Sequence, residues 1–489
     1  MTDDVLGALG DVPPGEMRAY LHRMADWIAD YRETIETRTI VPHIAPGEVA
    51  AGTSARLPDH AEPMSRILGD LDTVVMPGVV HWGHPAFLGY FGSTSNGPAL
   101  LGELAAAALN VSAMTWKTSP AATELEGVVL EWIRELIGLP PAFTGVVYDT
   151  ASVATLHALA AAREVSGSEI RARGVAGRAD VPLHRVYTSD QAHSSVAKAM
   201  VVLGLGEENV VRVPTDDAFR LDARALRAAM EADIALGFRP TAVVATIGTT
   251  STASVDPVAD IAELCRTNGV WLHVDAAYGG AFAALPEGRW VMRGVEQADS
   301  FVVNPHKWLF VPLDFSALFT RHPDALRSVF SLTPEYLRGD ATADGTVVNY
   351  MDYGIQLGRR FRALKAWMTF RALGRDGLIS RIREHCRLAS LLADRATQHP
   401  GIALAAPPMM AIVCFRFEPA GTSADETDAL NEAVAEAVNA SGMAYVTHTR
   451  LRGVSCVRVG IGNILTTERH VEQVWSVVLS EAQRLGALR

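Results

Sequence analysis

WLHVDAAYGG (residues 271–280) and SFVVNPHKWLF (residues 300–310) are the two stretches that decide the fold. Each begins with an apolar run that is typical of a buried strand. The first run ends in Asp275, and the second is followed by Asn304, Pro305, His306 and Lys307. Because ligands of open parallel sheets bind outside the carboxyl ends of the strands, we expect a carboxylate and an amine in one crevice. For Asp275 and Lys307 alone, a buried structural ion pair is the competing interpretation.

Strand-like apolar runs alternate with helical patterns from about residue 142 onward. The predicted strands are 144–148, 185–189, 209–213, 242–247, 270–274, 299–303 and 310–319. The predicted helices between them are 151–166, 192–203, 222–234 and 257–268. This alternation predicts an α/β fold with a mostly parallel central sheet that is covered on both faces.

Helical patterns dominate the two ends of the chain. Before the sheet, helices are predicted near 15–35, 62–71, 98–110 and 120–138. After it we expect a long helical stretch at 356–398, a strand at 410–417, a helix at 424–440, a hairpin at 443–461 and a closing helix at 466–485. The predicted units are therefore a helical N-terminal arm (1–95), a large α/β domain (96–372) and a small C-terminal α+β domain (373–489).

Composition and charge exclude several classes of protein. The chain of 489 residues has 43 basic and 55 acidic residues, hence a net charge of −12, and it has no long basic run. We therefore expect no nucleic-acid partner and no membrane association. The acidic start does not resemble a signal peptide, so a cytoplasmic location is expected. The cysteines are far apart and none forms a C-x-x-C pair, which argues against a disulfide framework and a thiolate metal site.

Lysine is unusually rare in this chain. The four lysines are Lys117, Lys198, Lys307 and Lys365, and arginine fills the other basic positions. Arginine cannot replace lysine where an amine must lose its proton, because guanidinium stays charged. Lys307 is the lysine that follows an apolar strand, so it is the candidate nucleophile, and chance retention is the alternative for the others.

Further polar residues follow the other predicted strands. Thr249 and Thr250 end one strand, Asp190 and His193 follow another, and Thr150-Ala151-Ser152 stands where a strand leads into a helix. A helix N-terminus with small hydroxyl residues can bind a phosphate. Each signal is weak alone, because such residues are usually caps or structural groups. Together they provide a phosphate seat, a stacking group, a carboxylate and an amine, which are the groups that hold pyridoxal phosphate.

Several segments carry a family resemblance in a consistent order. They are HWGHPAFLGYF, SPAATELEGVVLEWIRELIGLP, TASVATLHALAAAR, DQAHSSVAKA, IGTTSTASVDP, WLHVDAAYGGAF, NPHKW and LGRRFRALKAWMTFRALG. On these segments the chain resembles the group II pyridoxal-phosphate-dependent amino-acid decarboxylases, and among them the aromatic-L-amino-acid decarboxylases. The resemblance implies the aspartate-aminotransferase-like fold (fold type I) and a homodimer with its sites near the subunit interface.

The resemblance also implies a role for individual residues. Lys307 would bind the cofactor covalently, Asp275 would pair with its pyridine nitrogen, and His193 would stack on its ring. The remaining implied cofactor contacts are Ala151, Ser152 and Asn304 at the phosphate, His306 beside it, and Thr250 and Ala277 along the ring. Tyr336, in TPEYL, would return a proton to the substrate. Val153 departs from the family pattern, which usually has Glu there, and we expect a change in packing rather than loss of the cofactor.

Aromatic residues suggest the substrate class. The candidates for the pocket wall are Trp82, Phe87, Tyr90, Phe91, Trp116 and Trp308, and packing of the arm against the core is the alternative for most of them. By the same resemblance, Met114 and Gly358 fall at substrate-pocket positions, and Gly358 would leave room for an indole. The expected reaction is decarboxylation of an aromatic L-amino acid. The alternatives are an oxidative aldehyde synthase on the same scaffold, a decarboxylase of an acidic amino acid such as glutamate, and a catalytically silent protein.

Overall fold

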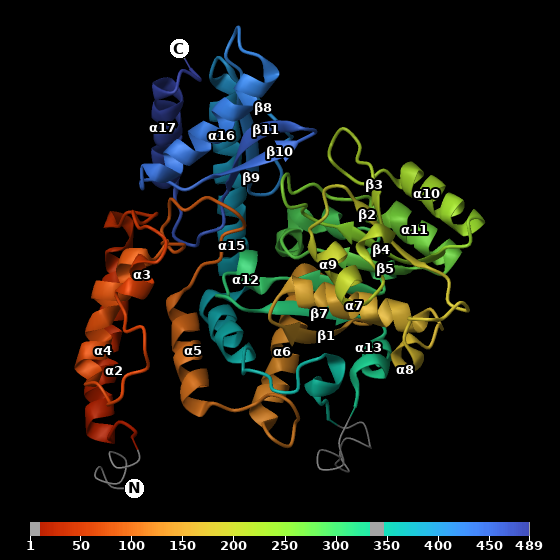
Figure 1. Cartoon of the computed structure of the whole chain (residues 1–489), viewed down its shortest axis with the longest axis horizontal. Helices are drawn as coiled ribbons and strands as arrows, with labels where there is room; N and C mark the ends of the chain where they lie inside the picture. The colour runs from red at the N-terminus through yellow and green to blue at the C-terminus, as the bar shows by residue number, and fades with distance from the viewer. Residues whose placement is uncertain (1–9, 333–346, 489) are drawn as a thin grey trace.

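A seven-stranded sheet forms the centre of the molecule (Figure 1). The computed structural model describes residues 10–332 and 347–488. The strands are β1 (Thr144–Tyr148), β2 (His184–Ser189), β3 (Val210–Val213), β4 (Arg239–Thr246), β5 (Trp271–Asp275), β6 (Ser300–Val303) and β7 (Ser316–Thr320). Their order is β1-β7-β6-β5-β4-β2-β3, and β7 runs antiparallel to both of its neighbours. The prediction of a mostly parallel sheet is confirmed.

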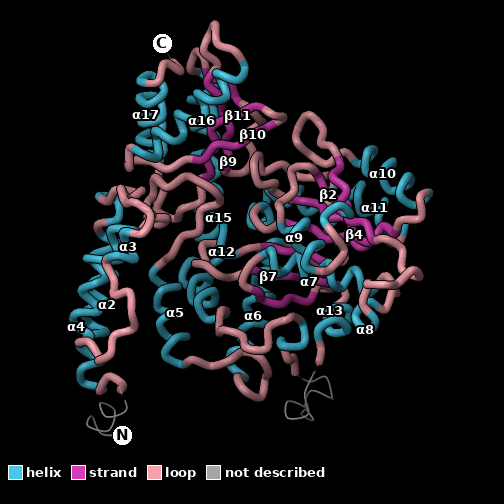
Figure 2. The backbone as a smooth tube through the Cα atoms, in the orientation of Figure 1, coloured by secondary structure: helices cyan, strands magenta, loops and turns pink. Residues whose placement is uncertain are grey.

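Helices cover both faces of this sheet, as the alternation predicted (Figure 2). They include α6 (Pro120–Ile137), α7 (Ala151–Val165), α8 (Ile170–Arg173), α9 (Ser195–Val202), α10 (Ala223–Ala235), α11 (Val258–Asn268), α12 (Pro305–Trp308) and α13 (Pro323–Phe330). The sheet is buried between them, so its strands are continuous apolar runs instead of alternating ones. Val243, Val244, Val274 and Phe301, for example, have no exposed side-chain surface.

One strand begins later than the sequence predicts. The apolar run at 310–319 suggested a single strand, but β7 starts only at Ser316. Leu309, Phe310 and Val311 are fully buried without being part of the sheet, and Phe310 has a left-handed backbone with φ of 61°. The apolar character of this run reflects burial in a connection, because a strand cannot accommodate that conformation.

The C-terminal part has its own sheet. After α15 (Ala363–Gln398) come β8 (Ile402–Leu404), β9 (Ile412–Phe417), α16 (Ala424–Ala440), β10 (Thr447–Leu451), β11 (Val454–Gly460) and α17 (Glu468–Arg484). The antiparallel order is β10-β11-β9-β8, which includes the predicted hairpin and the short strand β8 that the sequence pattern did not indicate. Non-helical geometry at Gly374 interrupts α15 near the boundary placed at 372/373, and the division into three domains stays a prediction.

The N-terminal arm lies along one side of the body (Figure 1). It contains α2 (Pro14–Glu33), α3 (Glu48–Ala51) and α4 (Met64–Asp70). Trp27 on α2 donates a hydrogen bond to Asp72 just after α4, but α2 has no buried side chain, and Met17 and Leu21 are 43% and 39% exposed. The N-terminal apolar positions of α2 are thus exposed, and the later ones are only partly covered within this chain. No helix in the described ranges is long and apolar enough to span a membrane.

A close helix contact joins the segment after the arm to the rest of the protein. Helix α5 (Gly97–Leu109) packs on α15, and Gly102 is placed so that a Cβ would lie 2.7 Å from the Cα of Lys365. Glycine is therefore required by the approach of two backbones. The contact also positions Lys365, whose buried ammonium pairs with Glu103 of α5.

Gly102→Ala should destabilise the protein despite the better helix propensity of alanine. The added methyl group forces α5 and α15 apart, at a cost of about 1–3 kcal/mol. Gly127→Ala on α6 is the matched control, because its Cβ would meet only the Tyr350 hydroxyl at 3.7 Å. Thermal unfolding of both variants tests this. Equal midpoints for the two would contradict the close-contact argument.

Candidate active site

A cavity of about 200 Å³ lies at the carboxyl edge of the central sheet. The residues that line it come from segments that are far apart in the sequence: Phe91, Thr150, Ala151, Ser152, His193, Thr246, Gly248, Thr250, Asp275, Ala277, Tyr278, Asn304 and Lys307. Asp275 is the last residue of β5, and Asn304 directly follows β6. Thr246 is the last residue of β4 and pairs with Asp275 in the sheet register. Parallel strands bring these chain ends together, as the sequence analysis expected.

Lys307 is the amine in this cavity. It has no hydrogen-bonded or ion-paired partner among the described residues, and its Nζ lies 4.7 Å from the centroid of the Phe91 ring. Removal from water lowers the pKa of Lys307 to about 8; Asp275 opposes this change and Arg458 adds to it. Lys365 is also buried but is neutralised by Glu103. Lys307 is thus the lysine best suited to react as a neutral amine.

Asp275 and His193 are the charged and aromatic groups facing Lys307. Asp275 is 6% exposed, and its carboxylate accepts a hydrogen bond of 3.1 Å from the backbone of Ala277. His193 accepts one of 3.1 Å from the Ser195 backbone, which fixes its ring. Burial lowers the pKa of His193, Asp275 raises it and Lys307 lowers it further. Their mutual influence shows that the three groups share one electrostatic environment.

The N-terminus of α7 provides an anion-binding end to the cavity. Thr150, the residue before the helix, makes no side-chain cap, so the first N–H groups remain available. Asn304 also lines the cavity, and its side-chain oxygen accepts a hydrogen bond of 2.7 Å from Ser316. Gly248 has φ of +89°, and a Cβ there would lie 2.8 Å from the backbone of Gly279. Glycine is therefore required at position 248 by its backbone conformation and by the approach of the Gly279 backbone.

Some residues assigned to the site from the sequence lie elsewhere. His306 is buried and accepts a hydrogen bond from the Phe315 backbone; it is not among the described residues that line the cavity. Trp308 has no exposed surface and donates a hydrogen bond to His385, and it is among the residues that line the adjoining pocket with Tyr90, Phe91 and Lys307. Val153 packs against the core from α7 without lining the cavity.

The other substrate candidates fall into two groups. Trp82 stacks on Phe87 and on Tyr90, with ring centroids 4.7 and 5.4 Å apart, beside the pocket. Met114, Trp116 and Gly358 line neither the cavity nor the adjoining pocket. The segment of Met114 and Trp116 is instead hydrogen-bonded to Met351 and Asn349. Tyr336 lies outside the described residues.

Arg458 is a site residue that the sequence analysis missed. Its guanidinium is almost fully buried, donates to the backbone carbonyls of Tyr90 and Ser251, and lies 4.9 Å from the Phe91 centroid. Its Nη2 has no partner within the described part of the chain. An arginine inside the apolar strand VSCVRVG was the signal available in the sequence, because such a charge is rarely buried without a function.

Comparison with known proteins identifies the family. Residues 46–418 match the model of the pyridoxal-dependent decarboxylase conserved domain. The chain belongs to the pyridoxal-dependent decarboxylase family. The chain is 38% identical over 478 residues to phenylacetaldehyde synthase of Arabidopsis thaliana, an alignment that covers 96% of each chain. It is 36% identical over 493 residues to tryptophan decarboxylase TDC1 of Camptotheca acuminata, over 98% of this chain and 96% of that protein.

A solved structure confirms the fold and the cofactor class of this family member. The crystal structure of Oryza sativa TDC with PLP and tryptamine matches with a TM-score of 0.92 and 35% identity, over 96% of this chain and 98% of the other. Fold type I is therefore confirmed, and pyridoxal phosphate is the cofactor of the family. The donor set fits that cofactor: an uncapped helix N-terminus for a phosphate, a carboxylate, and an amine of lowered pKa around one cavity.

The lowered pKa of Lys307 can be tested directly. In the cofactor-free protein, labelling of Lys307 by an aldehyde and cyanoborohydride should rise with pH around 8, whereas an ordinary lysine titrates near ~10.4. Arg458→Gln should move the midpoint up, because it removes a cation, and Asp275→Asn should move it down. Peptide mapping by mass spectrometry measures each site, with exposed Lys117 and Lys198 as reference sites. A Lys307 midpoint near ~10.4 would contradict the assignment.

Proposed function

We propose that this chain decarboxylates an aromatic L-amino acid to the corresponding amine and carbon dioxide. The observation that carries the proposal is the unpaired, partly buried Lys307 in one cavity with Asp275 and an aromatic wall. Bound pyridoxal phosphate supplies the electron sink for the electron pair left behind by the departing carboxylate. The residues of the chain bind and orient the reactants and control the protons.

Each charged residue has a defined task in this proposal. Lys307, as a neutral amine, would hold the cofactor covalently. Asp275 keeps a proton on the pyridine nitrogen, and His193 stacks on the ring. The N-terminus of α7 with Ala151 and Ser152, together with Asn304, holds the phosphate. Thr250 and Ala277 line the ring.

The aromatic wall supports an aromatic side chain on the substrate. Phe91 stacks on Tyr278 with centroids 4.0 Å apart, and Tyr90 and Trp82 continue the aromatic surface outward. Apolar rings bind another ring better than they bind a second carboxylate. This favours an aromatic amino acid over glutamate. A catalytically silent protein is disfavoured because Lys307, Asp275 and His193 converge on one cavity.

Arg458 is proposed to bind the carboxylate of the substrate. Its free Nη2 is buried close to Lys307, whose pKa it lowers, so the amine and carboxylate of an amino acid could be held together. A buried guanidinium with an open donor is costly unless an anion completes it. The carboxylate leaves this contact as neutral carbon dioxide, and an apolar environment favours that loss of charge.

Arg458→Gln should therefore weaken binding of the amino acid but not of the amine product. A lost charge-assisted hydrogen bond corresponds to about tenfold or more in Kd. The measurement is the Kd of the aromatic amino acid and of its amine for the holoenzyme, with Arg458→Lys as the charge-retaining control. Equal weakening of both ligands would show that Arg458 only supports the wall around Phe91.

An oxidative aldehyde synthase is the second candidate. The chain is 38% identical to a phenylacetaldehyde synthase and 36% identical to a tryptophan decarboxylase. Sequence similarity therefore supports the aldehyde synthase as strongly as it supports the decarboxylase. In both, the carboxylate leaves, and the two differ in whether a proton or dioxygen then reaches the substrate carbon. We propose that Tyr336 delivers that proton. A panel of Trp, 5-hydroxy-Trp, Tyr, Phe, Dopa, His and Glu in air, with carbon dioxide, amine, aldehyde and peroxide measured, decides between them.

Tyr336→Phe should move the products from amine towards aldehyde and peroxide. The substitution removes one hydroxyl and nearly preserves size, so binding should change little while protonation slows. Amine and peroxide are measured together in air on the best substrate of the panel. Unchanged amine with no peroxide would show that another group protonates the substrate. Mostly peroxide from the wild type would favour the aldehyde synthase.

We also propose a homodimer. The incompletely covered apolar positions of α2 need a partner surface, and Met114, Trp116 and Gly358, which do not line the cavity of their own chain, would face the cavity of the other subunit. A Cβ added at Gly358 would have no other atom within 4 Å, so the protein surface at Gly358 is open. A site shared between subunits explains why substrate candidates occur in two places.

Charges placed on the apolar stripe of α2 should dissociate the dimer. The double variant Met17→Glu and Leu21→Glu puts two carboxylates where apolar contact is expected, whereas Arg18→Glu changes a neighbouring exposed position. Analytical ultracentrifugation and turnover are measured for both variants. A dimeric, active double variant would contradict the proposed role of the arm.

A further inference from the structure

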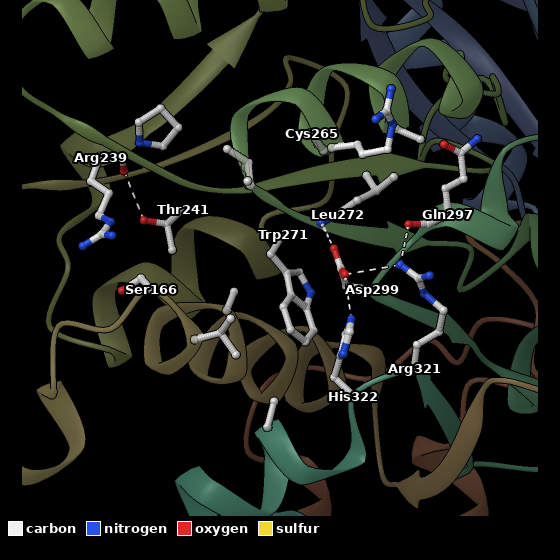
Figure 3. Close-up of a pocket in the computed structure, with 18 of the residues that line it drawn as sticks. Ser166, Arg239, Thr241, Cys265, Trp271, Leu272, Gln297, Asp299, Arg321 and His322 are labelled. Carbon is white, nitrogen blue, oxygen red and sulfur yellow. Dashed lines mark hydrogen bonds and ion pairs between the residues drawn. The ribbon is translucent and has the colours of Figure 1, made fainter.

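A second and larger cavity opens at the opposite, amino edge of the central sheet (Figure 3). Its volume is about 840 Å³, which is within the ~300–1,000 Å³ typical of small-molecule sites. It lies between the first residues of β4, the first residues of β5 and the C-terminal turns of α7 and α11. Because parallel strands run from this edge to the catalytic one, a ligand here would leave the catalytic cavity free.

Arg239 gives one end of this cavity an unmatched positive charge. It is half-buried and donates one weak hydrogen bond, of 3.4 Å, to the hydroxyl of Ser168. It has no carboxylate partner among the described residues, although a guanidinium carries five donors. The partial negative charge at the C-terminal ends of α7 and α11 stabilises the positive charge of Arg239. Most of the guanidinium donors nevertheless remain without an acceptor in residues 10–332 and 347–488.

The other two arginines that line the cavity are already neutralised. Arg266 pairs with both carboxylate oxygens of Glu263 at 2.7 and 2.8 Å. Arg321 donates to the carbonyls of Ala298 and Gln297 and lies 3.5 Å from Asp299. Asp299 is itself engaged, because it accepts from the backbone of Leu272. Arg239 is therefore the arginine of this cavity whose open hydrogen-bond donors an anion would best satisfy.

The middle and far end of the cavity are lined by aromatic rings and apolar side chains. The Trp271 ring lies 5.3 Å from the ring of His322, and both are held, by hydrogen bonds to Ser300 and Asp299 respectively. Figure 3 shows Trp271 between Arg239 on one side and Asp299, Arg321 and His322 on the other. The apolar side chains that complete the wall are Val165, Pro240, Cys265, Val270, Leu272 and Ala325.

We propose that this cavity binds an organic anion with a flat apolar body, such as an arylalkanoic carboxylate. The carboxylate would pair with Arg239, and the ring would lie against Trp271. An anion supplies the acceptors that Arg239 lacks, while the ring covers apolar wall that water would otherwise contact. This site is independent of the proposed reaction and of any residue placed in the catalytic cavity.

A charge series of near-equal size tests the ligand class. Isothermal titration calorimetry on the holoenzyme compares 3-phenylpropionate, the neutral 3-phenylpropanamide and the cationic 3-phenylpropylamine. The carboxylate should bind about tenfold or more tightly than the amide, as a charge-assisted hydrogen bond requires. Tighter binding of the amine, or no binding of the carboxylate, would overturn the proposal.

Two arginine variants locate the binding. Arg239→Gln should weaken 3-phenylpropionate by about tenfold or more, whereas Arg266→Gln, on the same cavity but paired with Glu263, should leave it unchanged. Ala325→Phe fills the cavity and should abolish the binding without changing turnover. Equal affinity of Arg239→Gln and wild type would place the ligand elsewhere and overturn the proposal, whatever the enzyme activity of the protein.

Discussion

The cavity at the carboxyl edge of the sheet depends on one amine that is withdrawn from water without a permanent counter-ion. Moving an ammonium out of water is costly, and a buried lysine therefore either acquires a carboxylate partner or shifts towards its neutral form. Lys365 follows the first course with Glu103, and Lys307 follows the second, with its pKa lowered to about 8. Asp275 and Arg458 act on Lys307 in opposite directions. The lowered pKa of Lys307 is thus a consequence of packing.

The sheet register places these groups together. Thr246 is opposite Asp275, and Asp275 is opposite Val302, just before Asn304 and Lys307. Because side chains alternate across a strand, a shift of one residue would turn Asp275 away from the cavity. The buried valines and phenylalanines of the strands prevent such a shift. The same register puts Arg239 and Trp271 at the far ends of their strands, which is why one sheet carries two polar cavities on opposite edges.

Local patterns predicted most elements and the residues at strand ends, because strand periodicity and the position of Asp275 or Lys307 are visible in a few residues of sequence. Tertiary features were harder to predict. The late start of β7 depends on the left-handed Phe310, and β8 is stabilised by its neighbour rather than by its own three residues. Arg458 reaches Phe91 from the C-terminal sheet, and the ring of Trp308 is fixed by its hydrogen bond to His385. No local pattern contains these contacts.

The fold and the binding geometry do not determine whether a proton or dioxygen reacts in the final step, and the reason is physical. A decarboxylase and an aldehyde synthase must bind the same amino acid, hold the same cofactor and release the same carbon dioxide. Their sites can therefore be shared down to Lys307, Asp275 and His193, and relatives of both kinds are 36–38% identical to this chain. The difference arises only afterwards, when a proton and dioxygen compete for one carbon. That competition is decided by how fast a donor reaches the carbon, so it is a property of proton delivery and not of substrate recognition.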